Sequence, residues 1–396
     1  MAADPWLTII GLGEDGPAGL GDASRAALAL ADVIFGAPRH LALVGAGGRG
    51  RDWPVPFKID PVLAEKGHRV VVLASGDPFW FGAGGSLSRA LSPDDWVCHP
   101  APSTFSHAAA RLGWRIEEVH SFGLHAAPFE RLLPILTHDQ RLMCLMRDGA
   151  AVAAMAAWLT ARGFGASDLT VMESLGGPSE RVRRAKADSF DLPDVAHPVA
   201  LAIFARGAKG LPRASGLPDD LFASDGVMTK RPIRALTLSA LAPRAGEVLW
   251  DLGAGSGSVS VEWCLAAPGT TAHAVEARAD RAANVRANAE AFGLSHRLRV
   301  VEQDWAEALR DLPVPDAVFI GGGADRAGLE TVWAAIPHGT RLVANAVTIE
   351  SEMLIAEWHR RTGGELFRYD VAQALPLGRM LGWAPARPVV QWSVVK

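Results

Sequence analysis

The sequence predicts an α/β protein of two domains, each organised around a β-sheet whose strands are connected by helices. A chain of 396 residues is long enough for two hydrophobic cores of ordinary size. Strand-like apolar runs alternate with helix-like stretches along both halves, which is typical of parallel sheets. Each half also has its own glycine-rich turn after a buried strand, "GLGEDGPAGL" near the start and "DLGAGSGS" past the middle.

The alternation of strands and helices stops between residues 207 and 224. The segment "GAKGLPRASGLPDDLFAS" is rich in glycine, proline and charge and shows little periodicity. We therefore expect a first domain over residues 1–207, a linker over residues 208–224 and a second domain over residues 225–396.

Composition and charge are those of an ordinary globular protein. Hydrophobic residues make up 49% and charged residues 21% of the sequence, and the formal net charge is −4. This charge supplies no basic field, so we expect neither a nucleic-acid nor a membrane partner. The longest apolar stretch, residues 150–161, is too short to span a bilayer, and the N-terminus with Asp4 lacks the basic region of a signal peptide.

The cysteines indicate the compartment. Cys98, Cys144 and Cys264 are far apart in the sequence, and their spacing fits no metal site. An odd number of separated cysteines indicates reduced thiols buried as small apolar residues. We therefore expect a cytoplasmic protein without a metal cofactor.

The first half begins with a strand over residues 7–10, followed by an alanine-rich helix. A second buried strand at residues 69–73 leads into "ASGDPFWFGAGG". In "PAPSTFSHAAARLGW", Ser103 or Thr104 is expected to cap a helix that ends near Gly113. Further strand-like runs follow in "RLMCLMRDG", "DLTVMESLGGPSERV" and "PVALAIF". This alternation predicts a largely parallel sheet.

The second half is predicted to be a Rossmann-like fold with a seven-stranded sheet. Five strands separated by helices indicate parallel βαβ units. Two final strand-like runs, with no full helix between them, predict an antiparallel hairpin at the sheet edge. The expected strands are residues 247–252, 271–276, 298–301, 317–320, 341–345, 366–372 and 388–395.

The glycine-rich turn of the second half favours S-adenosylmethionine over a dinucleotide. The dinucleotide pattern G-x-G-x-x-G needs a glycine where this chain has Ser258, and the third glycine comes one place early. Its spacing fits the D/E-x-G-x-G-x-G turn of adenosylmethionine enzymes. A leading Asp251 favours the ammonium group of the cofactor's amino-acid tail and repels a phosphate. The expected cofactor contacts are Asp251, Gly253, Ala254, Gly255, Ser256 and Gly257.

Two more acidic residues follow the next strands of the second half. Glu276 ends the second strand, where a carboxylate can accept both ribose hydroxyls, and Asp304 follows the third strand, where it could reach the adenine amino group. Each acid alone could equally be a helix cap or a surface charge. Dehydrogenases also use an acid at the position of Glu276. The three acids around one glycine turn together predict an adenosylmethionine site.

The second half resembles class I methyltransferases, and more narrowly the decarboxylating precorrin methyltransferases of the cobalamin pathway. The narrower resemblance depends on "DGVMTKRPIRALTLSAL", residues 225–241. It implies that Thr229 contacts the cofactor and that Lys230 and Arg231 lie beside the substrate. These cations and Arg234 fall in the first turns of an expected helix, where positive charge is unfavourable unless an anion lies nearby.

The first half resembles the tetrapyrrole methylase family over most of residues 5–206. The resemblance depends on the order and spacing of "GLGEDGPAGL", "SGDPFWFGAGG", "APSTFSHAAARLGW" and "ESLGGPSERV". In that family two loops line the adenosylmethionine cleft. The corresponding residues here are Gly76, Asp77, Pro78, Ser103 and Thr104, with the threonine in place of a more usual second serine.

Three other polar residues of the first half are interpreted as structural. Glu173 and Glu180 are expected to pair with the arginines of "RVRR" at residues 181–184. His125 is expected to be a surface or core histidine rather than a catalytic base.

The pairing of the two halves implies an enzyme of cobalamin (vitamin B12) biosynthesis. By this resemblance the first domain methylates a precorrin at C-5, and the second methylates C-15 and removes carbon dioxide from the C-12 acetate. The resemblance further implies one adenosylmethionine site in each domain and a homo-oligomer, which is usual in both families. Asp225 or a bound water is the hypothesised proton carrier of the decarboxylation.

Other functions stay open on the sequence alone. The second half could methylate RNA or protein, although the charge balance supplies no basic, aromatic face. The chain could also be a non-catalytic regulator that binds adenosylmethionine. An NAD-dependent dehydrogenase is disfavoured by Ser258 and Asp251. The absence of a catalytic triad is expected, because methyl transfer to an electron-rich carbon depends mainly on positioning and desolvation.

Overall fold

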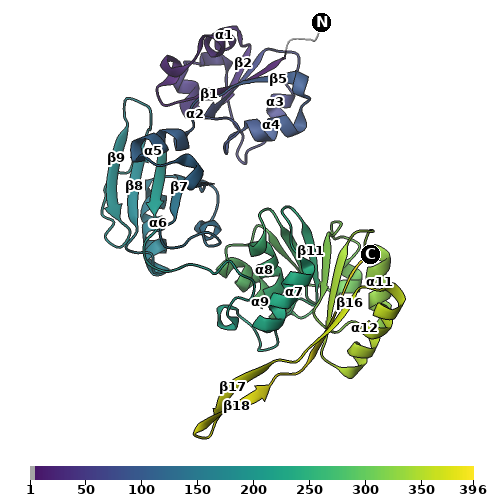
Figure 1. The fold of residues 1–396 in the computed structure, drawn as a ribbon. Coiled ribbons are helices and arrows are strands. Elements are labelled where there is room, and N and C mark those ends of the chain that lie inside the picture. Colours follow the sequence, from purple (N-terminus) through teal and green to yellow (C-terminus); the bar gives the residue numbers. More distant parts are fainter. Residues whose placement is uncertain (1–4) are drawn as a thin grey trace. The chain divides into compact units, whose positions relative to one another are not determined.

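The computed structural model describes residues 5–396, which form two compact units (Figure 1). Unit 1 runs up to Phe129 and continues over Leu136–Lys209, and unit 2 comprises Glu130–Ile135 and Gly210–Lys396. The expectation about a signal peptide depends on Asp4, which lies outside the described residues.

Unit 1 contains a parallel sheet with the strand order β3-β2-β4-β1-β5. Its strands are β1 (Leu7–Leu12), β2 (Val33–Gly36), β3 (Gly50–Asp52), β4 (Val70–Ser75) and β5 (Trp96–His99). The central strands β1 and β4 are buried nearly throughout, and their continuous apolar sequences fit a sheet that is covered on both faces. These are the two strands predicted from "LTII" and "RVVVL", so that prediction is confirmed.

The helices of unit 1 connect its strands. They are α1 (Asp22–Leu30), α2 (Pro38–Leu43), α3 (Asp60–Leu63), α4 (Gly84–Ala90), α5 (Thr104–Leu112) and α6 (Gly149–Ala161). The predicted cap of α5 is confirmed, because Ser103 Oγ accepts a hydrogen bond from the main-chain N–H of Ser106 at 3.0 Å. The helix ends at Gly113 in the left-handed conformation, also as predicted.

A second sheet in unit 1 is mainly antiparallel, so the prediction of a largely parallel sheet is wrong for this part. Its order is β6-β7-β10-β8-β9, and only β6 and β7 pair in parallel among these described strands. The chain turns from β8 directly into β9 and reaches β10 through an irregular segment, so no helix is present to make a parallel crossover. The strands are β6 (His120–Gly123), β7 (Arg141–Met146), β8 (Asp168–Glu173), β9 (Arg181–Lys186) and β10 (Val199–Phe204).

Unit 2 contains the predicted seven-stranded sheet, with the order β13-β12-β11-β14-β15-β19-β16. The first five strands are parallel, and β19 is antiparallel to both of its neighbours. The strand order reverses beside β11, and open α/β sheets bind ligands at such a switch point, at the carboxyl ends of the strands. The strands are β11 (Val248–Leu252), β12 (Thr271–Val275), β13 (Leu298–Val301), β14 (Ala317–Ile320), β15 (Arg341–Ala346), β16 (Glu365–Tyr369) and β19 (Val389–Val395).

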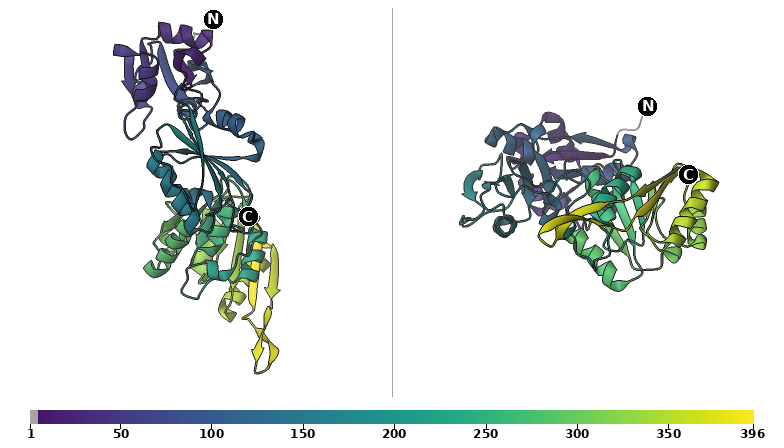
Figure 2. Two further views of the ribbon diagram at one scale, coloured as in Figure 1. Left: turned by 90° about the vertical axis from the view of Figure 1, so that its left-hand side faces the viewer. Right: turned by 60° about the horizontal axis from the view of Figure 1, so that its bottom comes forward.

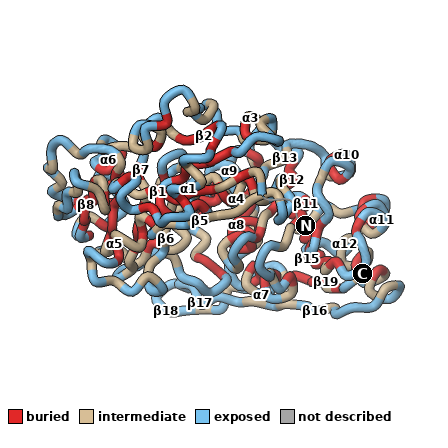
Figure 3. Tube along the Cα trace, turned by 90° about the horizontal axis from the view of Figure 1, so that it is seen from above, coloured by how far each residue is buried: buried red, intermediate tan, exposed pale blue. Residues whose placement is uncertain are grey.

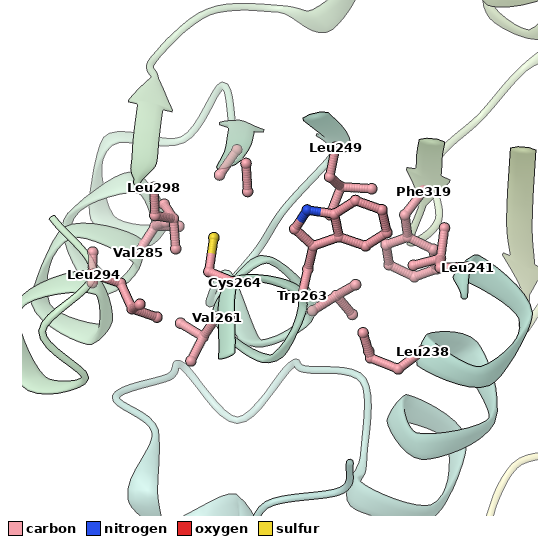
Figure 4. Packing of buried hydrophobic residues seen from close by; sticks show 14 of the residues in the cluster. Leu238, Leu241, Leu249, Val261, Trp263, Cys264, Val285, Leu294, Leu298 and Phe319 are labelled. Carbon is pink, nitrogen blue, oxygen red and sulfur yellow. The ribbon is translucent and has the colours of Figure 1, made fainter. Parts of the chain in front are cut away.

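The helices of unit 2 cover the two faces of this sheet. They are α7 (Arg231–Leu241), α8 (Ser258–Ala266), α9 (Ala279–Ala291), α10 (Trp305–Ala308), α11 (Arg326–Ala335) and α12 (Ile349–Thr362). On one face Trp263 is fully buried beside Leu249 and Phe319 (Figure 4). The next residue of β11, Trp250, belongs to the core on the other face, as expected for alternating side chains of a strand.

The segment predicted as a linker does not lie wholly outside the packed units. Its later residues Leu217 and Phe222 are buried in the core of unit 2, which also contains Leu238 and Leu241 of α7. Residues 217–222 therefore form part of the folded structure of unit 2.

A two-stranded ribbon lies in the sequence between the two paired strands of the predicted edge hairpin. β16 and β19 pair antiparallel at the sheet edge, as expected, but β17 (Ala372–Leu377) and β18 (Met380–Pro385) are inserted between them. The ribbon extends away from the seven-stranded sheet (Figure 2), and it is largely exposed (Figure 3). Its apolar side chains include Met380 and Trp383, which are 78% and 77% exposed.

Candidate functional site

The glycine turn between β11 and α8 has the backbone that its sequence requires. Gly253, Gly255 and Gly257 have φ angles of +72°, +59° and +71°, a region that favours glycine. A Cβ at Gly257 would also lie only 2.7 Å from Cγ1 of Val285 on α9, so this glycine allows the turn to pack against that helix. The early third glycine is therefore a structural requirement of this turn.

Asp251 presents an unsatisfied carboxylate oxygen at the start of the turn. The residue is 1% exposed, and Oδ2 accepts hydrogen bonds from the main-chain N–H and the hydroxyl of Ser260. Oδ1 and the hydroxyl of Ser256 are buried without a hydrogen-bond partner among the residues that the structure describes. Burial raises the pKa of Asp251 to about 6. A buried acceptor and hydroxyl of this kind fit the charged amino-acid tail of adenosylmethionine.

Glu276 supports the same turn from the end of β12. The side chain is almost buried, and its Oε2 accepts a hydrogen bond from the main-chain N–H of Gly255 at 2.9 Å. Its Oε1 accepts one from the N–H of Arg278 at 3.0 Å. A carboxylate oxygen has two lone pairs, so each oxygen keeps one for a ribose hydroxyl. The structure thus brings Asp251, Glu276 and the glycine turn together, and the assigned cofactor contacts stay predictions.

Asp304 has the role of a helix cap. Its Oδ1 accepts a hydrogen bond from the main-chain N–H of Ala306 at 2.9 Å at the start of α10, and the side chain is exposed. This is the alternative role considered for a lone acid. The adenine contact stays a prediction, because no contact of this residue tests it.

The substrate-side residues stand at the N-terminal end of α7. Lys230 is the N-cap residue of this helix, and its Nζ donates to the carbonyl of Gly226 at 3.2 Å. The side chains of Lys230 and Arg231 are exposed, whereas Thr229 is half-buried. Exposed cations at a helix start are available to anions of a ligand.

Asp225 is held as an ionised carboxylate. Its Oδ2 pairs with Arg281 Nε at 2.8 Å, and its Oδ1 accepts from the N–H of Val227 at 3.0 Å. The hydrogen bond from Arg281 keeps the pKa of Asp225 below its ordinary value. Asp225 is therefore poorly suited to donate a proton at neutral pH.

For Arg234, the expected nearby anion belongs to the protein itself. Arg234 is fully buried, and its Nε lies 2.5 Å from Oε1 of Glu262 on α8. Its Nη1 also pairs with Asp219 at 3.0 Å. Glu262 in turn accepts hydrogen bonds from the N–H groups of Gly216 and Leu217. The buried pair of Arg234 and Glu262 thus connects the segment at Gly216 and Leu217 to α7 and α8.

The N-terminus of α7 and the glycine turn lie at the same edge of the sheet. Arg341 Nε, at the start of β15, donates to the carbonyl of Leu241, the last residue of α7, at 2.7 Å. Asn345, near the end of β15, donates to Thr237 Oγ1 at 3.0 Å. The helix therefore runs antiparallel to the strand, which places Lys230 towards the carboxyl edge.

A buried polar network at this edge was missed from the sequence. Gln391 Nε2 donates to Asn345 Oδ1 at 2.9 Å and to Thr237 Oγ1 at 3.1 Å. The hydroxyl of Tyr369, the only tyrosine of the chain, donates to Gln391 Oε1 at 3.3 Å. The sequence did contain a signal for this network, namely the amide side chains inside the strand-like runs "RLVANA" and "VVQWSVV". Buried amide groups are nearly always hydrogen-bonded, so two of them in buried strands indicate a polar network.

Unit 1 has a pocket of about 690 Å³ lined by residues from both of its sheets. Of the predicted cleft residues, Gly76, Ser103 and Thr104 line this pocket. Asp77 and Pro78 are not part of its lining. The structure therefore brings the two cleft loops together, with both predicted residues of the second loop but only Gly76 of the first at the pocket.

The glycines of the cleft loops allow close contact between main chains. Gly76 has a φ of +56°, and a Cβ there would lie 2.8 Å from Cα of Ser103. A Cβ at Gly11 would lie 2.0 Å from the carbonyl oxygen of Gly76. Asp77 Oδ1 accepts from the N–H of Phe79 at 2.8 Å and so shapes its own turn. These close main-chain contacts and the turn at Asp77 therefore determine the shape of the two cleft loops.

The two structural glutamates are paired, one of them differently from the prediction. Glu173 is buried between Arg181 and Arg183, as predicted. Glu180 pairs instead with Arg111 of α5, at 2.6 Å, so its predicted pairing with "RVRR" is wrong. The connection between β8 and β9 points Glu180 towards α5, a relation that sequence separation does not reveal.

The pocket also contains polar residues that the sequence analysis did not single out. His125, interpreted as structural, is one of the lining residues. Others come from the segment after β1, from α2, from the end of β4, from α5 and from the segment before β10. They are Glu14, Arg39, His40, Ser75, His107 and His197. The α2 residues could have been noticed in the sequence, because the run "PRH" places two basic side chains shortly after the buried strand β2.

Residues 5–396 contain neither a side-chain cluster placed to hold a metal ion nor a membrane-spanning helix. No group of three or more His, Cys, Asp or Glu side chains in this range is placed to hold a metal ion. No helix of the same range is long and apolar enough to cross a membrane.

Comparison with known proteins gives the family of each half. Residues 7–191 match the family of tetrapyrrole (corrin/porphyrin) methylases, and residues 220–396 match the precorrin methyltransferase domain. A solved C-terminal domain of precorrin-6Y C5,15-methyltransferase from Rhodobacter capsulatus is 55% identical to this chain. It covers 47% of this chain and 100% of its own, with a TM-score of 0.46.

Two relatives that are similar over nearly the whole chain carry the same name. A precorrin-6Y C(5,15)-methyltransferase [decarboxylating] from Sinorhizobium sp is 46% identical over 99% of this chain and 97% of its own length. One of the same name from Mycobacterium tuberculosis is 40% identical over 98% of this chain and 100% of its own length. The chain therefore belongs to the family of decarboxylating precorrin-6Y C(5,15)-methyltransferases.

Proposed function

We propose that this protein uses S-adenosylmethionine to methylate a precorrin at C-5 and C-15 and removes the carboxyl group of its C-12 acetate, in cobalamin biosynthesis. The observation that carries the proposal is the similarity over nearly the whole chain to relatives named for both methylations and for the decarboxylation. A methyltransferase acting on RNA or protein, or a non-catalytic regulator, is not favoured by these relatives.

We assign C-5 methylation to the first domain, residues 1–207, and C-15 methylation with decarboxylation to the second, residues 225–396. Support comes from a relative in Pyrobaculum calidifontis named "Probable cobalt-precorrin-6B C(15)-methyltransferase (decarboxylating)". It is 40% identical over 34% of this chain and 72% of its own length. A shorter protein with this name suggests that the two activities go together in one part of the chain.

Each domain is proposed to bind one adenosylmethionine, which supplies a methyl group on a positively charged sulfur. In unit 2, Asp251 and Ser256 would hold the amino-acid tail and Glu276 the ribose, while Thr229 contacts the cofactor near the substrate. In unit 1, the pocket formed by the loops of Gly76 and Ser103 would hold the second molecule. Calorimetry on the full chain is expected to find two equivalents, and one equivalent would contradict a site in each domain.

The residues of unit 2 would orient the substrate more than activate it. Lys230 and Arg231 are exposed cations at the carboxyl edge, suited to the carboxylates of a tetrapyrrole. Asp225, held ionised by Arg281, would act as a proton acceptor or as a counter-charge. Loss of carbon dioxide leaves an electron pair that must finally take up a proton at the former acetate carbon, and the ionised state of Asp225 favours another donor.

We propose the cytoplasm as the compartment and a homo-oligomer as the functional form. The three cysteines are free thiols, which supports a reducing compartment. The exposed apolar ribbon of β17 and β18 supports contact with another copy of the chain.

The mass of the product tests the proposed function. The purified protein is incubated with precorrin-6Y and adenosylmethionine, and the product is weighed by mass spectrometry. Two methyl gains with one loss of carbon dioxide are expected. Methylation of RNA or protein with no conversion of any precorrin would contradict the proposal.

A further inference from the structure

The pocket of unit 1 contains one ion pair that the cofactor motifs do not include. Arg39 of α2 pairs with Glu14, which follows β1. These two are the only Asp, Glu, Lys or Arg residues among the described residues that line the pocket. Most other lining side chains are apolar or aromatic, so Arg39 is the main positive group that a ligand would meet there.

The guanidinium of Arg39 is held by three neighbours. Nη1 pairs with Glu14, and Nη2 donates to Ser75 Oγ at 3.1 Å and to His40 Nε2 at 2.9 Å. The side chain is 28% exposed, so the group is fixed without being closed off from the pocket. Burial lowers the pKa of Arg39, because partial desolvation disfavours the charged form. A fixed, partly desolvated guanidinium is preorganised for a carboxylate.

The contact with Arg39 determines the proton position on His40. A guanidinium only donates hydrogen bonds, so Nε2 of His40 accepts and the ring proton resides on Nδ1. Burial, and then the charge of Arg39, lower the pKa of His40 to about 4, so the ring is neutral at neutral pH. Nδ1 is buried and has no hydrogen-bond partner in the part of the chain that the structure describes. His40 therefore has one ring nitrogen in contact with the guanidinium and a second, protonated ring nitrogen without a partner.

We propose that Arg39 and His40 form a carboxylate-binding subsite in the pocket of unit 1. A guanidinium has five N–H donors, and Ser75 and His40 accept from Nη2. Nη1 forms an ion pair with Glu14 but has no hydrogen-bond partner among the described residues, so donors are left for a ligand. Before the ligand binds, Glu14 is the counter-charge of the guanidinium and competes with a ligand carboxylate for it. Carboxylate is the shared chemistry of two groups that the proposed function brings to this pocket, the acid side chains of the tetrapyrrole and the amino-acid tail of adenosylmethionine.

This inference rests on the proposed function, and unit 2 provides an internal control. Arg39→Gln and Arg39→Lys are measured in the full chain beside Arg25→Gln, which removes an exposed arginine paired with Asp22. The Michaelis constant for the precorrin in C-5 methylation is expected to rise roughly 10- to 100-fold in both Arg39 variants. C-15 methylation and decarboxylation are expected to keep their wild-type rates, which would show that the protein is folded.

A second measurement distinguishes the two sources of the carboxylate. The Kd of S-adenosylhomocysteine is measured by calorimetry for the unit 1 site, with the unit 2 site blocked by Gly255→Arg. A raised Michaelis constant with unchanged Kd assigns the subsite to the tetrapyrrole, and a raised Kd assigns it to the cofactor tail. Unchanged values of both in Arg39→Gln would overturn the proposal.

Glu14→Gln provides a readout that a purely structural ion pair would not give. Removing the competing carboxylate should strengthen ligand binding at Arg39. Whichever constant Arg39→Gln raises, the Michaelis constant for the precorrin or the Kd of S-adenosylhomocysteine, should therefore fall in Glu14→Gln. A rise in that constant would contradict the assigned role of Glu14 and Arg39. Absence of any precorrin conversion by the wild-type protein would instead refute the proposed function, and the cofactor Kd would still test the subsite.

Discussion

Asp251 Oδ2 accepts hydrogen bonds from the main-chain N–H and the hydroxyl of Ser260, at 3.2 and 2.6 Å, while Asp251 Oδ1 has no partner within residues 5–396. The first turn of α8 thus fixes this carboxylate and leaves one oxygen for a ligand. Burial raises its pKa to about 6, and the neighbouring charge of Glu276 acts in the same direction. The charge of Asp251 is therefore sensitive to what binds beside it.

Adenosylmethionine binding to unit 2 should weaken as the pH falls through about 6. A cofactor ammonium group favours the ionised carboxylate, so binding near this pH should release a proton from Asp251. Calorimetry at pH 6 in two buffers of different ionisation enthalpy measures that proton. Asp251→Asn should release none and should bind weakly at every pH. Wild-type binding at this site without proton release would contradict the assigned role of Asp251.

The same carboxylate should destabilise the protein when no cofactor is bound. Its folded pKa of about 6 exceeds its ordinary value of 3.8, so folding favours the protonated form. The contribution to stability is therefore most favourable below pH 3.8 and is lost as the pH rises through about 6. Asp251→Asn should raise the local free energy of unfolding by about 1 to 3 kcal/mol at pH 8, measured by hydrogen exchange in β11.

The wild type itself supplies the control for this stability difference. The advantage of Asp251→Asn should shrink as the pH is lowered from about 6 towards 4, because wild-type Asp251 then becomes protonated. A difference that is independent of pH would mean that the substitution acts through packing.

The buried pair of Arg234 and Glu262 should be essential for the stability of unit 2. Arg234→Met leaves Glu262 buried without its cation, and we expect a loss of about 3 to 5 kcal/mol. Hydrogen exchange of α7 and α8 measures this loss in unit 2 specifically. Arg326→Met breaks the exposed pair with Glu357 and should cost at most about 1 kcal/mol. Equal losses in both variants would show that burial does not decide the effect.

The ribbon of β17 and β18 should hold copies of the chain together. Leu377, Met380, Leu381 and Trp383 are all more than two-thirds exposed, an unusual concentration of apolar surface. We expect the double substitution Leu381→Ser and Trp383→Ser to reduce the molar mass measured by light scattering to that of a monomer. Val314→Ser is the matched control, because Val314 is equally exposed (72%) but lies outside the ribbon. A monomeric wild type, or an unchanged mass of the variant, would contradict this role.

The sequence predicted those parts of the fold that depend on local pattern. The strands of unit 2, the cap of α5 at Ser103 and the turn from Gly253 to Gly257 all follow from residues close together in the chain. The antiparallel second sheet of unit 1 was not predicted, because a strand-like run of residues does not show whether its neighbour in the sheet is parallel or antiparallel. The ribbon was missed since "ALPLGRML" lacks the alternation of polar and apolar residues that marks a half-buried strand.

The residues of the candidate sites also divide into those that a local sequence pattern reveals and those that depend on contacts between distant parts of the chain. Asp251 and Glu276 were found because both lie at a recognisable strand end, Asp251 within the last two residues of β11 and Glu276 directly after β12. Arg39 and His40 were missed because their partner Ser75 lies 35 or more residues away, and only the folded chain brings them together. Arg234 was noticed as a cation in an unfavourable place, but its partner Glu262 could not be identified without the packing of α7 against α8.

The central claim is that two separate sites carry out the three reaction steps, and Gly255→Arg tests it most directly. An arginine there would occupy the turn beside Asp251 and strain a φ of +59°. Gly246→Arg is the matched control, because Gly246 also has a positive φ but precedes β11 at the opposite edge of the sheet. Product masses from precorrin-6Y and adenosylmethionine are compared with wild type. The Gly255→Arg product should gain one methyl group and retain its carboxylate, whereas a wild-type product, or no methylation by a folded variant, would contradict the claim.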